Sequence, residues 1–155
     1  MKKDAPEKTT AGEPRPPLRL ARLARQIYEA AQARVYAGLA GEGFPEIRPA
    51  HSAIFRNIDP KGSRASDLAQ RAGITKQSVA YLIDGLVAEG FVEILPDPED
   101  GRARLARLTQ RGRAAYAALT RLSEAVDRDL AASLPEGRLE VLREDLAAIV
   151  RQLGG

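Results

Sequence analysis

The sequence predicts a mainly α-helical protein with a small β wing, in which a winged helix-turn-helix unit is embedded in a helical region. Residues 62–109 read in order as a short helix, a glycine turn, a second helix and two strand-like runs around a polar turn. Long apolar stripes with helical spacing lie on both sides of this segment. A chain of 155 residues is long enough to bury a core around such a unit.

Composition excludes several classes of function. The chain has no cysteine and a single histidine, so thiol catalysis, thiol redox switching and a cysteine or histidine metal cage are not expected. No nucleophile–base pair or phosphate loop stands out, and we expect neither an enzyme nor a cofactor. No apolar run reaches the length of a membrane span, and the basic N-terminus lacks the apolar core of a secretory signal. We therefore expect a cytoplasmic protein without a membrane partner.

Charge is distributed unevenly along the chain. Residues 114–155 carry 5 basic and 7 acidic side chains, whereas residues 101–113 carry five arginines and no acid. The five are Arg102, Arg104, Arg107, Arg111 and Arg113. Such a strip suits contacts with phosphates, and a solvated charged face is the alternative.

The N-terminal half begins with residues 1–17, which are rich in Lys, Glu, Pro and Thr and predict a disordered tail. A helix is expected over residues 18–39, with Gly38 among the glycines that end it. Pro49 suits the first position of a second helix reaching Ile58. A turn follows, and Ser63 is expected to cap the next helix.

The central segment carries the reading unit. A helix over 65–72 and the Gly73 turn lead to a Thr75 cap and a second helix over 76–89. Its buried stripe is predicted to be Val79, Leu82, Ile83 and Leu86. Strands are expected over 91–95 and 104–108. Thr109 then caps a helix to Ser133, and a final helix over 136–153 is expected to turn Leu139, Leu142, Leu146, Ile149 and Val150 inward.

These residues resemble the MarR family of bacterial transcription regulators. The resemblance is carried by DLAQRAGITKQSVAYLIDGLVAEGFVE and by PEDGRARLARLT, where Asp100, Arg102 and Leu108-Thr109 match the family's wing motif, and it covers residues 18–153. It implies a homodimer built by residues 18–45 and 110–155, with a winged helix-turn-helix DNA-binding domain at 46–109. Tyr81 and Gly85 depart from the charged residues that the family often has there.

The resemblance implies that the second helix enters the major groove of double-stranded DNA. Gln77 suits adenine, Lys76 suits guanine or a phosphate, and Ser78 suits either base. Tyr81 is a further candidate, although it could instead pack on a neighbouring helix, and an exposed helix face always carries polar residues.

The wing is the second expected contact with DNA. Arg102 at its tip suits the narrow minor groove, and Arg104 follows on the return strand. Asp100 is expected to hold Arg102 or to stiffen the turn. A simple Asp-Gly turn with a solvated arginine is the alternative.

Family members that sense small molecules bind them between the reader and the dimer base. This implies a small aromatic or phenolic effector near Tyr28, His51, Phe55 and Tyr116; plain core packing is the alternative for each. The sequence therefore predicts a sequence-specific DNA-binding regulator, with repression of a pseudo-palindromic operator as the default. The alternative is a winged-helix protein-interaction module without specific DNA binding.

Overall fold

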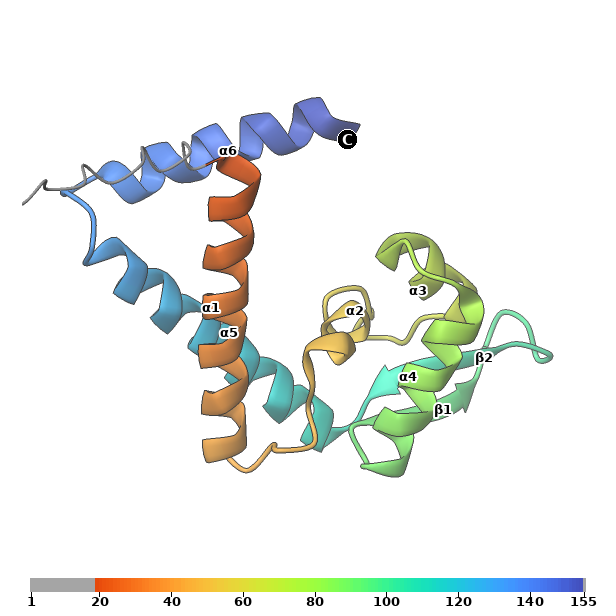
Figure 1. The fold of residues 1–155 in the computed structure, drawn as a ribbon. Helices are drawn as coiled ribbons and strands as arrows, with labels where there is room; N and C mark the ends of the chain where they lie inside the picture. The colour runs from red at the N-terminus through yellow and green to blue at the C-terminus, as the bar shows by residue number, and fades with distance from the viewer. Residues whose placement is uncertain (1–18, 155) are drawn as a thin grey trace, which may run out of the picture.

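A computed structural model describes residues 19–154, and the tail expected over residues 1–17 lies outside the described residues. Its elements in chain order are α1 (Leu20–Gly41), the 3₁₀ turn η1 (Pro49–His51), α2 (Ser52–Phe55), α3 (Ala65–Ala72), α4 (Lys76–Ala88), β1 (Val92–Pro96), β2 (Arg104–Leu108), α5 (Gln110–Ala131) and α6 (Arg138–Gly154) (Figure 1). In this part of the chain, no helix is long and apolar enough to cross a membrane.

The long helices and the compact unit occupy different parts of the molecule. In Figure 1, α3, α4 and the β1–β2 hairpin gather beyond one end of α5, and α6 extends from the other end. Helix α1 packs against α5. A Cβ atom on Gly38 would lie 2.6 Å from the Cδ2 atom of Leu122, so the missing side chain lets the two helices cross closely. Of the glycines Gly38, Gly41 and Gly43 that were expected to end the helix, Gly41 is its last residue and Gly38 lies inside it.

The core lies where α2, α3 and α4 meet the sheet and the end of α1. Val79, Ile83 and Leu86 of α4 are buried as predicted, and Leu82 is partly buried against them. The largest fully buried side chains come from five segments: Leu39, Ile54, Leu68, Val79, Leu86 and Phe91. The apolar face of α4, formed by residues at helical spacing, is therefore the surface against which the other elements pack.

Local signals define the helix-turn-helix. Gly73 has a φ of 65°, a left-handed conformation that glycine adopts at little cost, and it ends α3. Thr75 caps α4 by accepting a hydrogen bond of 3.1 Å from the backbone N–H of Ser78. Both features were predicted. The cap proposed for α3 was wrong, because Arg64 holds the N-cap position and Ser63 is buried in a bridge to Ala106.

The wing is an antiparallel hairpin in which Val92 pairs with Leu108 and Pro96 with Arg104. The second predicted strand matches β2, and the first is displaced by one residue. The helix expected from Pro49 to Ile58 is shorter than predicted. It consists of a 3₁₀ turn and one turn of α-helix that ends at Phe55.

Helix α6 corrects another expectation. Its apolar stripe was predicted to point inward, yet Val150 is 66% exposed and Leu153 is 80% exposed. Leu142, Leu146 and Ile149 are also exposed. The polar link to the rest of the chain is Arg143, which binds Asp127 of α5 at 2.8 Å. A single chain therefore leaves the apolar face of α6 uncovered.

The wing joins α5 through a close backbone approach. Thr109 accepts a hydrogen bond from the N–H of Gly112 at 3.0 Å and donates its hydroxyl to the carbonyl of Gly90 at 2.7 Å. Gly112 is buried, and a Cβ atom there would collide with the backbone carbonyl of Phe91. Only glycine fits at this junction between the reading unit and the long helix.

The Gly112→Ala substitution should therefore destabilise the fold, although alanine favours helix. We expect the free energy of unfolding to fall by about 1–3 kcal/mol, the usual result of overpacking a filled site. Urea unfolding followed by circular dichroism measures it. Gly41→Ala is the matched control, because a Cβ atom at Gly41 meets nothing within 4 Å. Equal stability of the two variants would contradict the close approach.

Candidate nucleic-acid interface

The outer face of α4 is open to solvent. Lys76, Gln77, Ser78 and Tyr81 are all exposed, as predicted for a reading surface, and Tyr81 is 78% exposed. The Ser78 hydroxyl lies 2.8 Å from the Thr75 hydroxyl, so it is already engaged in the cap of the helix. The side chains of Lys76, Gln77 and Tyr81 make no hydrogen bond or ion pair within residues 19–154, whereas Ser78 is exposed but shares its hydroxyl with the cap.

The wing turn is held by Asp97, which is buried. One carboxylate oxygen accepts the backbone N–H of Glu99 at 2.9 Å, and the other accepts the Nε of Arg64 at 2.7 Å. Arg64 also lies 3.8 Å from the carboxylate of Asp100. The amide of Glu99, and then the Arg64 guanidinium, hold the pKa of Asp97 below its usual value. Arg64 precedes α3, so this contact ties the wing to the helix-turn-helix.

Sequence reasoning missed the pair of Arg64 and Asp97. A partial signal was present, because an aspartate at the start of a turn often accepts the N–H two residues later. Asp100 has the second of its two predicted roles. Its carboxylate accepts the backbone N–H of Arg102 at 3.1 Å and so stiffens the turn.

The five arginines of the basic strip fall into two groups. Arg107 binds Glu93 across the hairpin at 2.9 Å, and Arg113 donates to the carbonyl of Leu108. Arg111 lies over the ring of Phe91 at 4.3 Å. By contrast, Arg102 and Arg104 are exposed and have no side-chain hydrogen bond or ion pair within residues 19–154. These two wing arginines are the ones free to meet an external anion.

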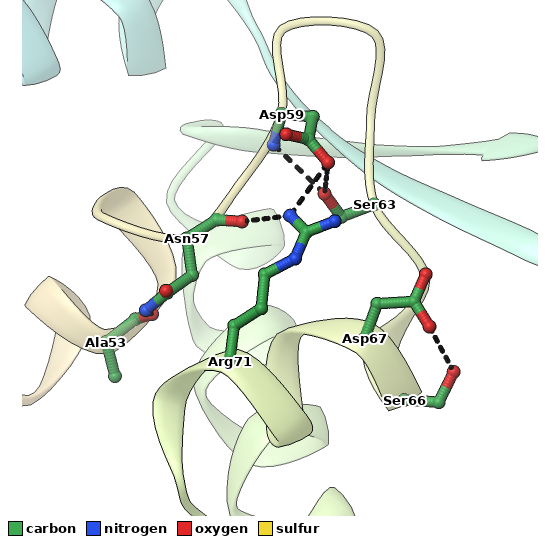
Figure 2. Close-up of polar contacts among 7 residues, drawn as sticks. All are labelled: Ala53, Asn57, Asp59, Ser63, Ser66, Asp67 and Arg71. Atoms are coloured by element: carbon green, nitrogen blue, oxygen red, sulfur yellow. Dashed lines mark hydrogen bonds and ion pairs between the residues drawn. The ribbon is translucent and has the colours of Figure 1, made fainter. Parts of the chain in front are cut away.

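A polar network fixes the loop between α2 and α3, as Figure 2 shows. Arg71 of α3 reaches the carbonyl of Asn57 at 2.8 Å and the carboxylate of Asp59 at 2.7 Å. The Ser63 hydroxyl donates to the same carboxylate at 3.0 Å. These hydrogen bonds, that of Arg71 foremost, keep the pKa of Asp59 low. Because Ser63 also pairs with Ala106 of β2, the loop joins α3 to the wing.

The residues expected near an effector separate into two places. Tyr28, Phe55 and Tyr116 line one hollow of about 420 Å³ between α1, α2 and α5. His51 does not join them. It lines a second hollow, between α4 and residues 45–51. Burial, and then the charge of Arg48, hold the pKa of His51 below its usual value, and its Nδ1 accepts the backbone N–H of Arg48 at 3.1 Å. A neutral capping histidine fits these contacts.

No cluster of three or more His, Asp or Glu side chains within the described part of the chain is arranged to hold a metal ion. The candidate interface consists of the exposed face of α4 and the wing arginines Arg102 and Arg104. The order of two helices followed by an antiparallel hairpin is that of a winged helix-turn-helix fold.

Comparison with known proteins agrees with this fold. A sequence model described as the MarR family matches residues 47–103. Wild-type MarR from E. coli superposes with a TM-score of 0.69 at 21% identity, covering 86% of this chain and 98% of that one. A probable transcriptional regulator from Pseudomonas aeruginosa gives 0.66 at 23% identity, covering 84% and 96%. The uncharacterized protein Rv2011c of Mycobacterium tuberculosis is 25% identical over 84% of this chain and 92% of its own length.

The chain is similar to the MarR family over residues 47–103 and has the winged helix-turn-helix fold of the solved MarR protein. The family match lies on the segment that forms η1 to the wing tip, and the solved structures share the fold around it.

The Asp97→Ala substitution should loosen the wing turn, because it removes the acceptor of both the Glu99 amide and the Arg64 guanidinium. We expect hydrogen exchange at the Glu99 amide to accelerate about tenfold, consistent with the loss of a charge-assisted hydrogen bond. Glu99→Ala is the control, because it leaves that amide bond in place. Unchanged protection in the Asp97 variant would refute the role of this carboxylate.

Proposed function

We propose that this protein is a sequence-specific DNA-binding repressor that acts in the cytoplasm as a homodimer on a pseudo-palindromic operator. The observation that carries the proposal is the pairing of an open α4 face with two wing arginines that have no partner within residues 19–154. The remaining arginines of the strip are used inside the fold, so the free charge is concentrated at the wing.

On DNA, α4 would lie in the major groove with Lys76 and Gln77 at base edges. Ser78 and Tyr81 are the other proposed contacts on this helix. Arg102 and Arg104 would meet the backbone and the narrow minor groove beside it. Asp100 supports this placement because it fixes the backbone at Arg102. Each side chain is exposed, so none has to break a core contact to reach DNA.

Dimerisation is proposed from the uncovered apolar faces of the long helices. Leu20 and Ile27 on α1 are 55% and 47% exposed, and the stripe on α6 is open as well. A monomer that left both faces in water would lose the free energy of burying them. The segments 18–45 and 110–155 are therefore proposed as the dimer base. Two copies related by a two-fold axis would read half-sites about 34–36 Å apart.

The hollow between α1, α2 and α5 is the proposed effector site. Its volume of about 420 Å³ lies in the range of small-ligand sites. Tyr28, Phe55 and Tyr116 offer aromatic surface, and Arg56 offers a cation, which together suit a small aromatic or phenolic acid. His51 lies outside this hollow and is not part of the proposed site.

Fluorescence anisotropy with DNA from the protein's own promoter, measured over a salt series, tests the proposal. Specific binding with a steep loss of affinity as salt rises supports the DNA reader. If neither promoter DNA nor pooled genomic fragments bind, the alternative of a winged-helix protein-interaction module is favoured.

The Arg102→Ala substitution should weaken binding to all sequences and reduce the slope of log affinity against log salt by about 1. The physical reason is the loss of one phosphate-neutralising charge at the wing tip. Arg107→Ala is the matched control, because Arg107 is already paired with Glu93. If the two variants lose equal affinity, the assignment of Arg102 to DNA contact is wrong.

The Leu146→Glu substitution should convert the dimer to a monomer, because it places a charge in the apolar face of α6. Light scattering at micromolar concentration measures the mass, and circular dichroism checks that the helices remain. Glu144→Lys changes the charge of a neighbouring exposed position and should leave the dimer intact. A wild-type protein that is monomeric at this concentration would contradict the proposed helical base.

A further inference from the structure

Gly85 lies in the interior of α4, where glycine weakens a helix relative to alanine. Packing does not require it there. A Cβ atom on Gly85 would meet nothing within 4 Å, and the backbone is not in the left-handed region. By contrast, a Cβ atom at Gly112 would meet the backbone of Phe91, and one at Gly38 would meet the side chain of Leu122. The packing of the fold therefore does not explain a glycine at position 85. Its role must lie in a contact with another molecule.

Tyr81 lies one helical turn before Gly85 on the same face. Its side chain is 78% exposed, and its hydroxyl has no hydrogen-bond partner within residues 19–154. Side chains on a helix lean toward its N-terminus, so a side chain at position 85 would extend over Tyr81. Glycine leaves the phenol ring uncovered. Both residues also line the hollow of about 520 Å³ between α4 and residues 45–51, so the surface beside the ring is open.

The charges on α4 restrict what the ring can contact. Within Lys76–Ala88 the basic residue is Lys76, in the first turn, and the acidic residue is Asp84, close to Tyr81. The middle of the helix therefore does not attract phosphates. In the major groove, the apolar group displayed by a base pair is the 5-methyl group of thymine. An uncovered aromatic ring that lies next to an acid and more than one helical turn after the lysine fits that methyl group.

We propose that Tyr81, in the space left by Gly85, packs on the 5-methyl group of a thymine and so sets part of the base preference of the reader. This inference rests on the proposed DNA-binding function. Gln77 lies one turn before Tyr81 on the same face and suits adenine, so the two side chains together select A·T pairs.

The test removes only the methyl group. The full-length wild-type chain first enriches binding duplexes from a random double-stranded library. Each thymine of the enriched site is then replaced in turn by deoxyuridine, which keeps the base pair and lacks the methyl group. Anisotropy compares the affinities. At one thymine position in each half-site, deoxyuridine should lower the affinity of the wild-type protein about fourfold. This is the effect expected from losing the burial of one methyl group.

Variants assign the effect to the two residues. Tyr81→Ala should bind the thymine and deoxyuridine duplexes equally, and Tyr81→Phe should keep the discrimination. Gly85→Ala should raise the melting temperature and reduce the discrimination, and Gly85→Leu should abolish it by covering the ring. Gly41→Ala, another helical glycine with open space around its Cβ position, should leave the discrimination unchanged. A Gly85→Ala variant that is more stable but discriminates less would show that Gly85 acts in base recognition and not in stabilising the fold.

The two proposals fail in different ways. If the library yields no enriched sequence, the proposed DNA-binding function fails. If a site is enriched but every deoxyuridine replacement leaves wild-type affinity unchanged, the function stands and the methyl contact is refuted. Discrimination that persists in Tyr81→Ala, or in Gly85→Leu, also overturns the assignment. All variants alter exposed positions, and their melting curves confirm that they fold.

Discussion

The carbonyl of Phe91 organises the molecule, because the reading unit and the long helices both depend on it. It accepts the backbone N–H of Thr109 at 3.0 Å and fills the space where a side chain at position 112 would lie. The ring of the same residue is fully buried and lies under Arg111, which in turn binds Glu46 at 3.1 Å. The end of α4, the start of α5 and the segment after α1 therefore meet at one rigid junction, and a displacement of α5 has to move the wing as well.

A second set of contacts fixes the wing relative to the helix-turn-helix. Arg64 holds Asp97 at the start of the wing turn, and Ser63 pairs with Ala106 in the return strand. Arg71 closes the loop on the other side by binding Asp59 (Figure 2). The proposed base contacts on α4 and the proposed phosphate contacts on the wing thus belong to one body. A reader built this way loses little conformational entropy when both contacts form at once.

Short-range signals made most of the reading unit predictable. Gly73, Thr75 and Thr109 act within three or four residues of their positions, so their turn and cap roles follow from local chemistry. Asp97 and Arg64 are 33 residues apart, and no periodicity connects them. Ser63 failed as a cap because its hydroxyl is used by Asp59. His51 was grouped with the tyrosines because of the family resemblance, but the short η1 turn places it on the α4 side.

For the apolar stripe of α6, prediction from the sequence was limited in a different way. Periodicity shows that a helix has an apolar face, but it does not say which chain covers that face. The hollow between α1, α2 and α5 is lined by Tyr28 and Tyr116 from the long helices and by Phe55 from α2. A molecule bound there would press on α2, which packs on α3, and would leave the Phe91 junction untouched. In the proposed dimer, such pressure would therefore reach each reader through α2 and α3, while the Phe91 junction keeps the wing fixed to α5.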